Sequence, residues 1–465
     1  MVRPESPETG LTAERRETLL GAVLIALACV SFYIRLRFVM SEPYPASWDS
    51  FFYLEGLRQF LSTNMHVYWL HATFFSFWGT FGQLLGLTDV QTYRVAMLFS
   101  FFMVGVALAA IAWALRFGVY ALALPVMVWS MNLFFNAAYI SLSEMFGFAI
   151  FCTGLFFFVW EPHAKLRIAA RVTGNFLFAF AAFTHIFSAV LVTSLYVPTA
   201  HFRRERMHPV EKIIFAVALI FCFTHFVENP KPFFSYLTDF GSIHFEMKRW
   251  YFEAYQYREF IFSTIVIFVA AFFLVKNGDR SWLTWMLFAI YLALISPLWI
   301  TYLKKADHSG SFTDRLPQTA PLVWLVFMAV AFHKTKLKSV RKALFLFSAL
   351  FLFAQWFYSR GNERKLGPPM SVGLLADNRD LLKTWIPEDA YVRAMHGVQF
   401  RVTYFLGNES TRRPSASPEY FHLKIGIEPQ CVEIGTLTPE TIKDVNCVHL
   451  GEGWVIRREK TERGA

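Results

Sequence analysis

The chain has 465 residues, of which 55% are hydrophobic and 17% are charged, and its mean hydropathy is +0.39. A soluble domain cannot bury that much apolar side chain, so the composition indicates an integral membrane protein. The formal net charge of +10 is typical of basic cytoplasmic loops in such a protein, and we expect no nucleic-acid partner.

The amino-terminal segment is polar and then basic, and an apolar run follows at 19–39. No small-residue cleavage site follows this run, so it predicts a retained first span rather than a signal peptide. A helix needs about 20 apolar residues to cross the hydrocarbon. Runs that meet this requirement predict further spans at 93–115, 119–137, 145–160, 211–227, 259–275, 281–303, 318–332 and 342–358.

The segment 168–200 is too long for one span and short for two. Its flanks, "KLRIAAR" and "HFRRERMHPVEK", both belong to the basic loops that the positive-inside rule assigns to the cytoplasm. The segment must therefore leave and return, with its tip near Thr184–His185. This gives eleven spans, a cytoplasmic amino terminus and an outer carboxyl terminus. Arg35 and Arg37, at the outer end of the first span, run against the rule.

The sequence therefore divides into a transmembrane domain, 1–358, and a small soluble α/β domain outside the cytoplasm, 359–465. In the second, "DNRDLLKTWI" predicts a helix, and "AYVRAMHG", "QFRVTYFLG", "QCVEIGTL" and "WVIRRE" predict strands between Gly, Pro and Asn. Cys431 and Cys447 are either free or bridged, and a bridge requires that this domain lies outside the cytosol.

Ionisable residues gather at the predicted outer face, where such groups are costly and tend to mark function. Asp49, in "PASWDSFFYLEGLRQFL", follows the first span, and Glu144 opens the fourth. Each carboxylate is either a helix-terminal group or an acid/base residue. Further candidates are the aromatic residues Trp48 and Tyr53, the histidines His71 and His185, and the basic residues Lys304, Lys305 and Arg315.

The histidines and the basic residues also have structural interpretations. His71 could face headgroups, and His185 is better explained as a core histidine bonded to a neighbouring helix. Arg315 could anchor a span at the interface, whereas Arg and Lys together could hold a lipid-linked phosphate.

Several motifs resemble the GT-C-type glycosyltransferases, the superfamily of protein O-mannosyltransferases and aminoarabinose transferases. "WDSFFYLEGLRQFL" is similar to the first outer loop of that superfamily, and "NAAYISLSEMFGFAI" to its short second loop with a further acid. "TYRVAMLFSFFMVGVAL", "FAFAAFTHIFSAVL" and "DRLPQTAPLVWLV" resemble its second span, its fifth span and a late span. The resemblance covers most of 15–358 and implies a GT-C-like helical fold.

The resemblance also implies a reaction and roles for the candidates. A sugar would pass from a polyprenyl-phosphate donor to a glycan, lipid or protein acceptor, with inversion. Asp49 would be the catalytic base, supported by Glu144. Arg315, Lys304 and Lys305 would bind the donor phosphate, and Trp48, Tyr53, His71 and His185 would line the acceptor site or the lipid groove.

Two departures from the superfamily stand out. Its first-loop acid is often doubled, and Ser50 takes the second place here. The tail also lacks the Trp-Trp-Asp signature of the oligosaccharyltransferases, another branch of this superfamily. Its absence argues against transfer of a preassembled glycan to protein Asn. Asp49 and Glu144 could hold Mg²⁺ or Mn²⁺, although two carboxylates alone do not establish a cofactor.

Two other functions stay open. One is a membrane transporter or flippase, although the sequence contains no internal repeat of the kind many transporters have. The other is a catalytically silent assembly partner with the same scaffold. The compact loops favour a bacterial inner membrane with a periplasmic tail, and membrane lipids are the other expected partners. The sequence indicates no oligomeric state.

Overall fold

A computed structural model describes residues 7–184 and 338–460 apart from short gaps, together with isolated positions between 209 and 276. The gaps within the two long ranges are 42, 46–49, 65–70, 133–134, 136–141, 161–163, 360–369, 395–397, 409, 411–418 and 427.

The chain forms two compact units. The first contains Met1–Met40, Trp69–Phe74 and Val95–Glu363, and the second contains Ser41–Tyr68, Phe75–Arg94 and Arg364–Ala465. The carboxyl-terminal boundary lies close to the predicted division after residue 358. The second unit, however, also takes in two segments that the sequence assigned to the transmembrane domain.

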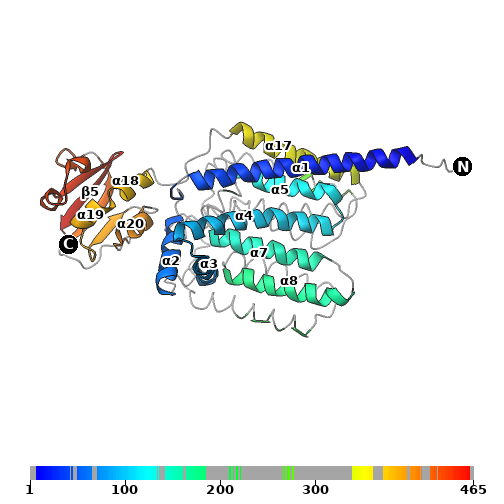
Figure 1. Cartoon of the computed structure of the whole chain (residues 1–465), viewed down its shortest axis with the longest axis horizontal. Helices are drawn as coiled ribbons and strands as arrows, with labels where there is room; N and C mark the ends of the chain where they lie inside the picture. Colours follow the sequence, from blue (N-terminus) through cyan, green and yellow to red (C-terminus); the bar gives the residue numbers. More distant parts are fainter. Residues whose placement is uncertain are drawn as a thin grey trace, which may run out of the picture. The chain divides into compact units, whose positions relative to one another are not determined.

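The first unit is helical, as the hydropathy predicts. Its helices are α1 (Pro7–Ser41), most of α4 (Asp89–Ala114), α5 (Ala123–Ser130), α7 (Leu142–Val159), α8 (Ala164–Thr184) and α17 (Lys338–Ser359) (Figure 1). Within the described residues, four stretches are long and apolar enough to span a membrane: Glu14–Ser41, Asp89–Ala114, Leu142–Val159 and Leu166–Thr184. The protein is therefore an integral membrane protein. The count of eleven spans stays a prediction, because most of the other expected spans lie outside the described residues.

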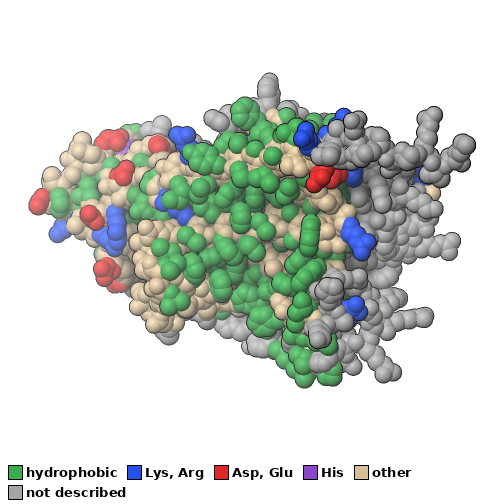
Figure 2. Space-filling view, turned by 45° about the vertical axis from the view of Figure 1, so that its right-hand side comes forward, with side chains coloured by type: hydrophobic (Ala, Val, Ile, Leu, Met, Phe, Trp, Pro, Cys, Tyr) green, Lys and Arg blue, Asp and Glu red, His purple; other side chains and the backbone are tan. Residues whose placement is uncertain are grey.

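Hydrophobic side chains face outward along these helices, where lipid can cover them. Figure 2 shows a broad hydrophobic surface over the helices. Exposed members include Leu19 and Ile25 on α1, Phe99 on α4, Phe176 on α8 and Phe347 on α17. A soluble protein rarely leaves so large an apolar surface uncovered.

The predicted span 119–137 is interrupted. A short 3-10 helix, Gly118–Leu122, leads into α5, which ends at Ser130, and Met131 is extended. A break inside a membrane leaves backbone carbonyls that water cannot satisfy. Arg35 of α1 is 2% exposed and donates to the carbonyl oxygens of Trp129 and Ser130, both at 3.4 Å. Arg35 is thus a buried packing group, which explains why the loop-charge rule does not apply to it.

Helices α7 and α8 run side by side (Figure 1) and approach closely at two glycines. A Cβ added to Gly154 would lie 3.0 Å from the carbonyl oxygen of Gly174, and the reverse distance is also 3.0 Å. Small residues at such crossings let membrane helices pack by close van der Waals contact.

In the second unit, α2 (Ser50–Thr63) packs beside α3 (Ala72–Leu85), most of which belongs to this unit. A Cβ at Gly56 of α2 would meet the Phe75 ring of α3. Helix α4 then begins with a capping box, because Gln91 N–H donates to Thr88 Oγ1 and Thr88 N–H donates to Gln91 Oε1.

The tail forms a five-stranded sheet in the order β1-β2-β5-β4-β3. Its strands are β1 (Tyr391–Ala394), β2 (Glu419–Ile425), β3 (Val432–Glu433), β4 (Cys447–Gly451) and β5 (Trp454–Lys460). Strands β1 and β2 are parallel, and β2 and β5 are antiparallel with Leu423 opposite Ile456. Its helices are α18 (Val372–Asp377), α19 (Arg379–Trp385) and α20 (Gln399–Leu406). The Trp385 ring meets Phe421 at 5.1 Å, so α19 packs on the apolar face of the sheet.

The structure confirms the predicted helix in "DNRDLLKTWI" and the strands at β1 and β5, but it corrects the strand predicted for "QFRVTYFLG". That segment is α20. Its alternating apolar residues match a strand, yet Arg401, Val402, Tyr404 and Phe405 are all buried, which is a helical pattern. Gly407, at φ 83°, ends the helix in the left-handed conformation that glycine adopts without strain.

Candidate functional site

Glu144 lies in the first turn of α7 and is 6% exposed. The sequence predicted a carboxylate at the start of this helix, and the structure places it there. A helix amino terminus stabilises a nearby negative charge. A buried carboxylate in this position fits both a structural and a catalytic role.

His71, a predicted acceptor-site residue, lies beside the start of α7. Its Nδ1 is 2.8 Å from Ser143 Oγ, and Ser143 directly precedes Glu144. Three residues after His71, the Phe74 ring meets Phe146 of α7 edge to face at 5.9 Å. These contacts bring two of the predicted site residues, His71 and Glu144, to one end of α7.

At the start of α2, Ser50 makes a buried polar contact with Tyr93. Ser50 Oγ is 2.9 Å from Tyr93 OH, and both residues are fully buried. Ser50 occupies the position at which the GT-C glycosyltransferases, which the motifs resemble, often have a second acid. A serine hydroxyl can donate to or accept from the tyrosine OH without placing a buried charge there.

Tyr53 is a packing residue in the described structure. Its side chain is 1% exposed, and its ring lies 5.3 Å from that of Phe52, 6.2 Å from that of Phe75 and 6.5 Å from that of Tyr93. Aromatic residues of α2, α3 and α4 surround Tyr53, and its role in the acceptor site or the lipid groove stays a prediction.

The other predicted site residues lie outside the described residues: Trp48, Asp49, His185, Lys304, Lys305 and Arg315. Their roles stay predictions. Asp49 immediately precedes Ser50, the first residue of α2.

A cluster of charged residues in the second unit was not predicted from the sequence. Arg58 of α2 forms an ion pair with Glu55 one turn earlier and donates to the Tyr404 carbonyl at 2.6 Å. Tyr404 OH in turn donates to Asp89 Oδ2 at 2.9 Å. The spacing of Glu55 and Arg58 could have indicated an ion pair on a helix. Nothing local marked Tyr404, which was assigned to a strand.

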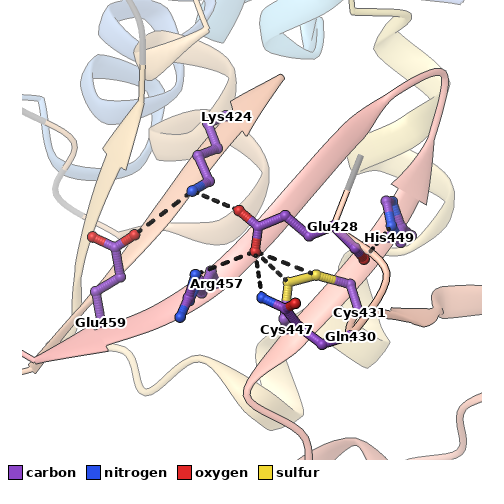
Figure 3. The surroundings of a disulfide bond; sticks show 8 residues. All are labelled: Lys424, Glu428, Gln430, Cys431, Cys447, His449, Arg457 and Glu459. Atoms are coloured by element: carbon purple, nitrogen blue, oxygen red, sulfur yellow. Dashed lines mark hydrogen bonds and ion pairs between the residues drawn. A yellow bond between two sulfur atoms is a disulfide. The ribbon is translucent and has the colours of Figure 1, made fainter. Parts of the chain in front are cut away.

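In the tail, Cys431 and Cys447 form a disulfide (Figure 3), one of the two alternatives that the sequence left open. Beside it, Glu428 forms ion pairs with Lys424 at 2.7 Å and Arg457 at 3.3 Å. The hydrogen bond from Lys424 is the main reason that the pKa of Glu428 lies below its usual value. A disulfide is typical of protein outside a reducing cytosol.

Within the described part of the chain, the only group of at least three His, Cys, Asp or Glu side chains close enough to share an ion is Glu428, Cys431 and Cys447. The disulfide occupies both sulfur atoms, so this group does not fit a metal. The predicted pair Asp49 and Glu144 is described only at Glu144.

The sequence matches no known family model, and a comparison with curated proteins finds no match. Solved structures do match. ArnT from Cupriavidus metallidurans in the apo state has 13% sequence identity and a TM-score of 0.53, over 97% of this chain and 98% of that chain. ArnT bound to undecaprenyl phosphate has 12% identity and a TM-score of 0.54, over 95% and 98%. The chain therefore has the fold of ArnT, the GT-C fold that its motifs predict.

Proposed function

We propose that this protein is a membrane glycosyltransferase that moves a sugar from a polyprenyl-phosphate donor to an acceptor outside the cytoplasm. The observation that carries the proposal is the full-length fold match to ArnT, one structure of which binds undecaprenyl phosphate. The match covers 95% of this chain and 98% of that chain, so the likeness extends over both the helical part and the tail. The acceptor is a glycan, a lipid or a protein.

In the proposed reaction, an acceptor hydroxyl or amine attacks the anomeric carbon of the sugar while the bond to the polyprenyl phosphate breaks. Asp49 accepts the proton of the acceptor, and the polyprenyl phosphate leaves with the electron pair of the broken bond. Attack from the face opposite the leaving group inverts the anomeric centre.

Glu144 orients the acceptor in this proposal. Its burial supports that role, because a carboxylate held by a rigid helix start can bind a hydroxyl in one geometry. His71, through Ser143, lies at the same helix end and is the second candidate contact for the acceptor. If the reaction uses Mg²⁺ or Mn²⁺, Asp49 and Glu144 are the residues that would hold it.

Arg315, with Lys304 and Lys305, binds the phosphate in this proposal. Charge develops on the phosphate oxygens as the sugar leaves, and fixed cations stabilise that charge. The disulfide in the tail supports a location outside the cytosol, which in a bacterium is the periplasmic face of the inner membrane.

The test is a deletion strain complemented with variants, with the envelope glycans and lipids analysed by mass spectrometry. Wild type should restore one sugar modification, and Asp49→Asn and Glu144→Gln should abolish or strongly reduce it at equal membrane abundance. Glu433→Gln, on the exposed strand β3, is the matched carboxylate control and should keep activity. Full activity of Asp49→Asn would reject the assigned base, and substrate flux without any donor lipid would favour a transporter.

A further inference from the structure

Helix α20 of the tail packs against α2 through a set of aromatic contacts. The Phe51 ring lies 5.5 Å from that of Tyr404 and 5.4 Å from that of Phe405. The Phe52 ring lies 5.5 Å from that of Phe400. These contacts fall on the first turn of α2, directly after Asp49 in the sequence.

About two turns further along α2, polar contacts connect three segments that are far apart in the sequence. Arg58 lies over the Tyr404 ring at 4.8 Å and also donates to the Tyr404 carbonyl. Tyr404 OH bonds to Asp89 at the start of α4. Burial and the Asp89 carboxylate both raise the pKa of Tyr404, so its hydroxyl stays a hydrogen-bond donor at neutral pH. Tyr404 therefore contacts both α2 and α4.

Arg401 of α20 is a second cation at the contact between α20 and α2. It is 2% exposed, donates Nη1 to the Met370 carbonyl at 2.5 Å and lies 5.3 Å from the centre of the Phe51 ring. Burial lowers the pKa of Arg401 to about 10, so it remains charged at neutral pH. A buried charge is costly unless it is paired or hydrogen-bonded, and the bond to the Met370 carbonyl offsets part of that cost. The side of α20 that contacts α2 therefore consists of buried side chains, one of which is charged.

We propose that α20 is the element that positions α2, with Tyr404 and Arg58 as positioning residues for the acid that precedes this helix. The catalytic part of this inference rests on the function proposed above. Asp49 is joined to α2 by one peptide bond, so a shift of α2 moves the backbone from which the carboxylate extends. A displacement of about 1 Å can cost about 100-fold in rate. In this proposal the tail contributes to the reaction by holding α2 in position.

Tyr404→Phe is the sharpest test, because it removes only the hydroxyl that bonds to Asp89. In the full-length protein in detergent or nanodiscs, amide exchange across 50–63 should become about tenfold faster, since that segment loses an anchor. The kcat should fall about tenfold with KM changed less than about twofold, because geometry and not binding is altered.

The matched control is Tyr420→Phe. Tyr420 OH also donates to a carboxylate, Glu459 at 2.6 Å, but that bond lies within the sheet of the tail. This variant should leave both the exchange of 50–63 and kcat at wild-type values. A fall in kcat equal to that of Tyr404→Phe would overturn the inference, because general loosening of the tail would then suffice.

Arg58→Lys is the second test variant. It keeps the charge but loses the planar group that stacks on Tyr404 and bonds to its carbonyl, so it should act like Tyr404→Phe. Unchanged exchange across 50–63 in both variants would overturn the inference, and so would faster exchange with unchanged kcat. If the wild type transfers no sugar, the proposed function fails, whereas the exchange data still decide whether α20 holds α2.

Discussion

Arg35 of α1 donates a hydrogen bond of 2.6 Å to the side-chain oxygen of Asn132, 97 residues further along the chain. The same guanidinium lies 4.5 Å from the centre of the Phe135 ring and 5.0 Å from that of Trp356 on α17. One side chain thereby links α1, the end of α5 and α17. A cation can lie inside a helical membrane unit when carbonyls, an amide and aromatic faces surround it.

Arg35→Leu should destabilise the protein, because the carbonyls of Trp129 and Ser130 lose a donor where water cannot replace it. We expect a loss of about 2 kcal/mol, measured as a lower midpoint of thermal unfolding in detergent. Arg37→Leu is the control, since Arg37 is exposed two residues further on. Equal effects of the two substitutions would contradict the role assigned to Arg35.

Gly154→Val should separate α7 from α8. The new Cβ would meet the backbone carbonyl of Gly174 at 3.0 Å, and a backbone atom cannot move aside as a side chain can. The expected loss is about 1–3 kcal/mol in the free energy of unfolding. Gly435→Ala is the control, because a Cβ there meets nothing within 4 Å. If Gly154→Val unfolds at the wild-type temperature, the close crossing is not essential.

Mass spectrometry of the protein purified from membranes without a reducing agent should find a disulfide between Cys431 and Cys447. Alkylation should reach both thiols only after reduction. Replacement of either cysteine by serine should destabilise the tail by about 3 kcal/mol, because the bridge restricts the unfolded chain by joining residues 16 positions apart. Alkylation of both thiols without reduction would show that the tail does not carry the bridge.

The ion pairs of Glu428 should make stability fall at acid pH. Its pKa in the folded protein lies below the value of 4.5 for an unperturbed Glu, chiefly because Lys424 donates a hydrogen bond to it. The contribution is therefore complete above pH 4.5 and is lost as the pH falls through the folded-state pKa. Glu428→Gln should reduce the acid dependence of the unfolding midpoint. An unchanged pH profile in this variant would rule out the contribution.

His71→Ala should weaken acceptor use if the proposed function holds. It removes the imidazole that contacts Ser143 next to Glu144, so KM for the acceptor should rise by about threefold to tenfold while kcat changes less. Steady-state kinetics with the donor held at saturation measures this. His449→Ala, which removes a contact to the Glu428 backbone in the tail, should leave KM unchanged.

Much of this architecture was predictable from local patterns. Apolar length identified α1, α4 and α7 as membrane helices, and the basic flanks of 168–200 predicted a helix that ends near Thr184, as α8 does. Glu144 was expected at the start of α7, where it lies. The helix at 379–385 and the strands β1 and β5 followed from their own residues and the Gly, Pro and Asn around them. The strand β2 was missed although Phe421, Leu423 and Ile425 alternate with polar residues, and β4 was missed because it is only five residues long.

The remaining features depended on distant contacts. Arg35 looked like a misplaced surface charge until the end of α5 was beside it, and "QFRVTYFLG" looked like a strand until α2 packed against it. The sequence by itself determined the class of protein and the position of Glu144 at the start of a helix, because hydrophobic length and helix-terminal charge are properties of neighbouring residues. Only the tertiary structure decided that Tyr404 meets Arg58 and Asp89, because a hydrogen bond between residues more than three hundred positions apart exists only when the whole chain brings them together.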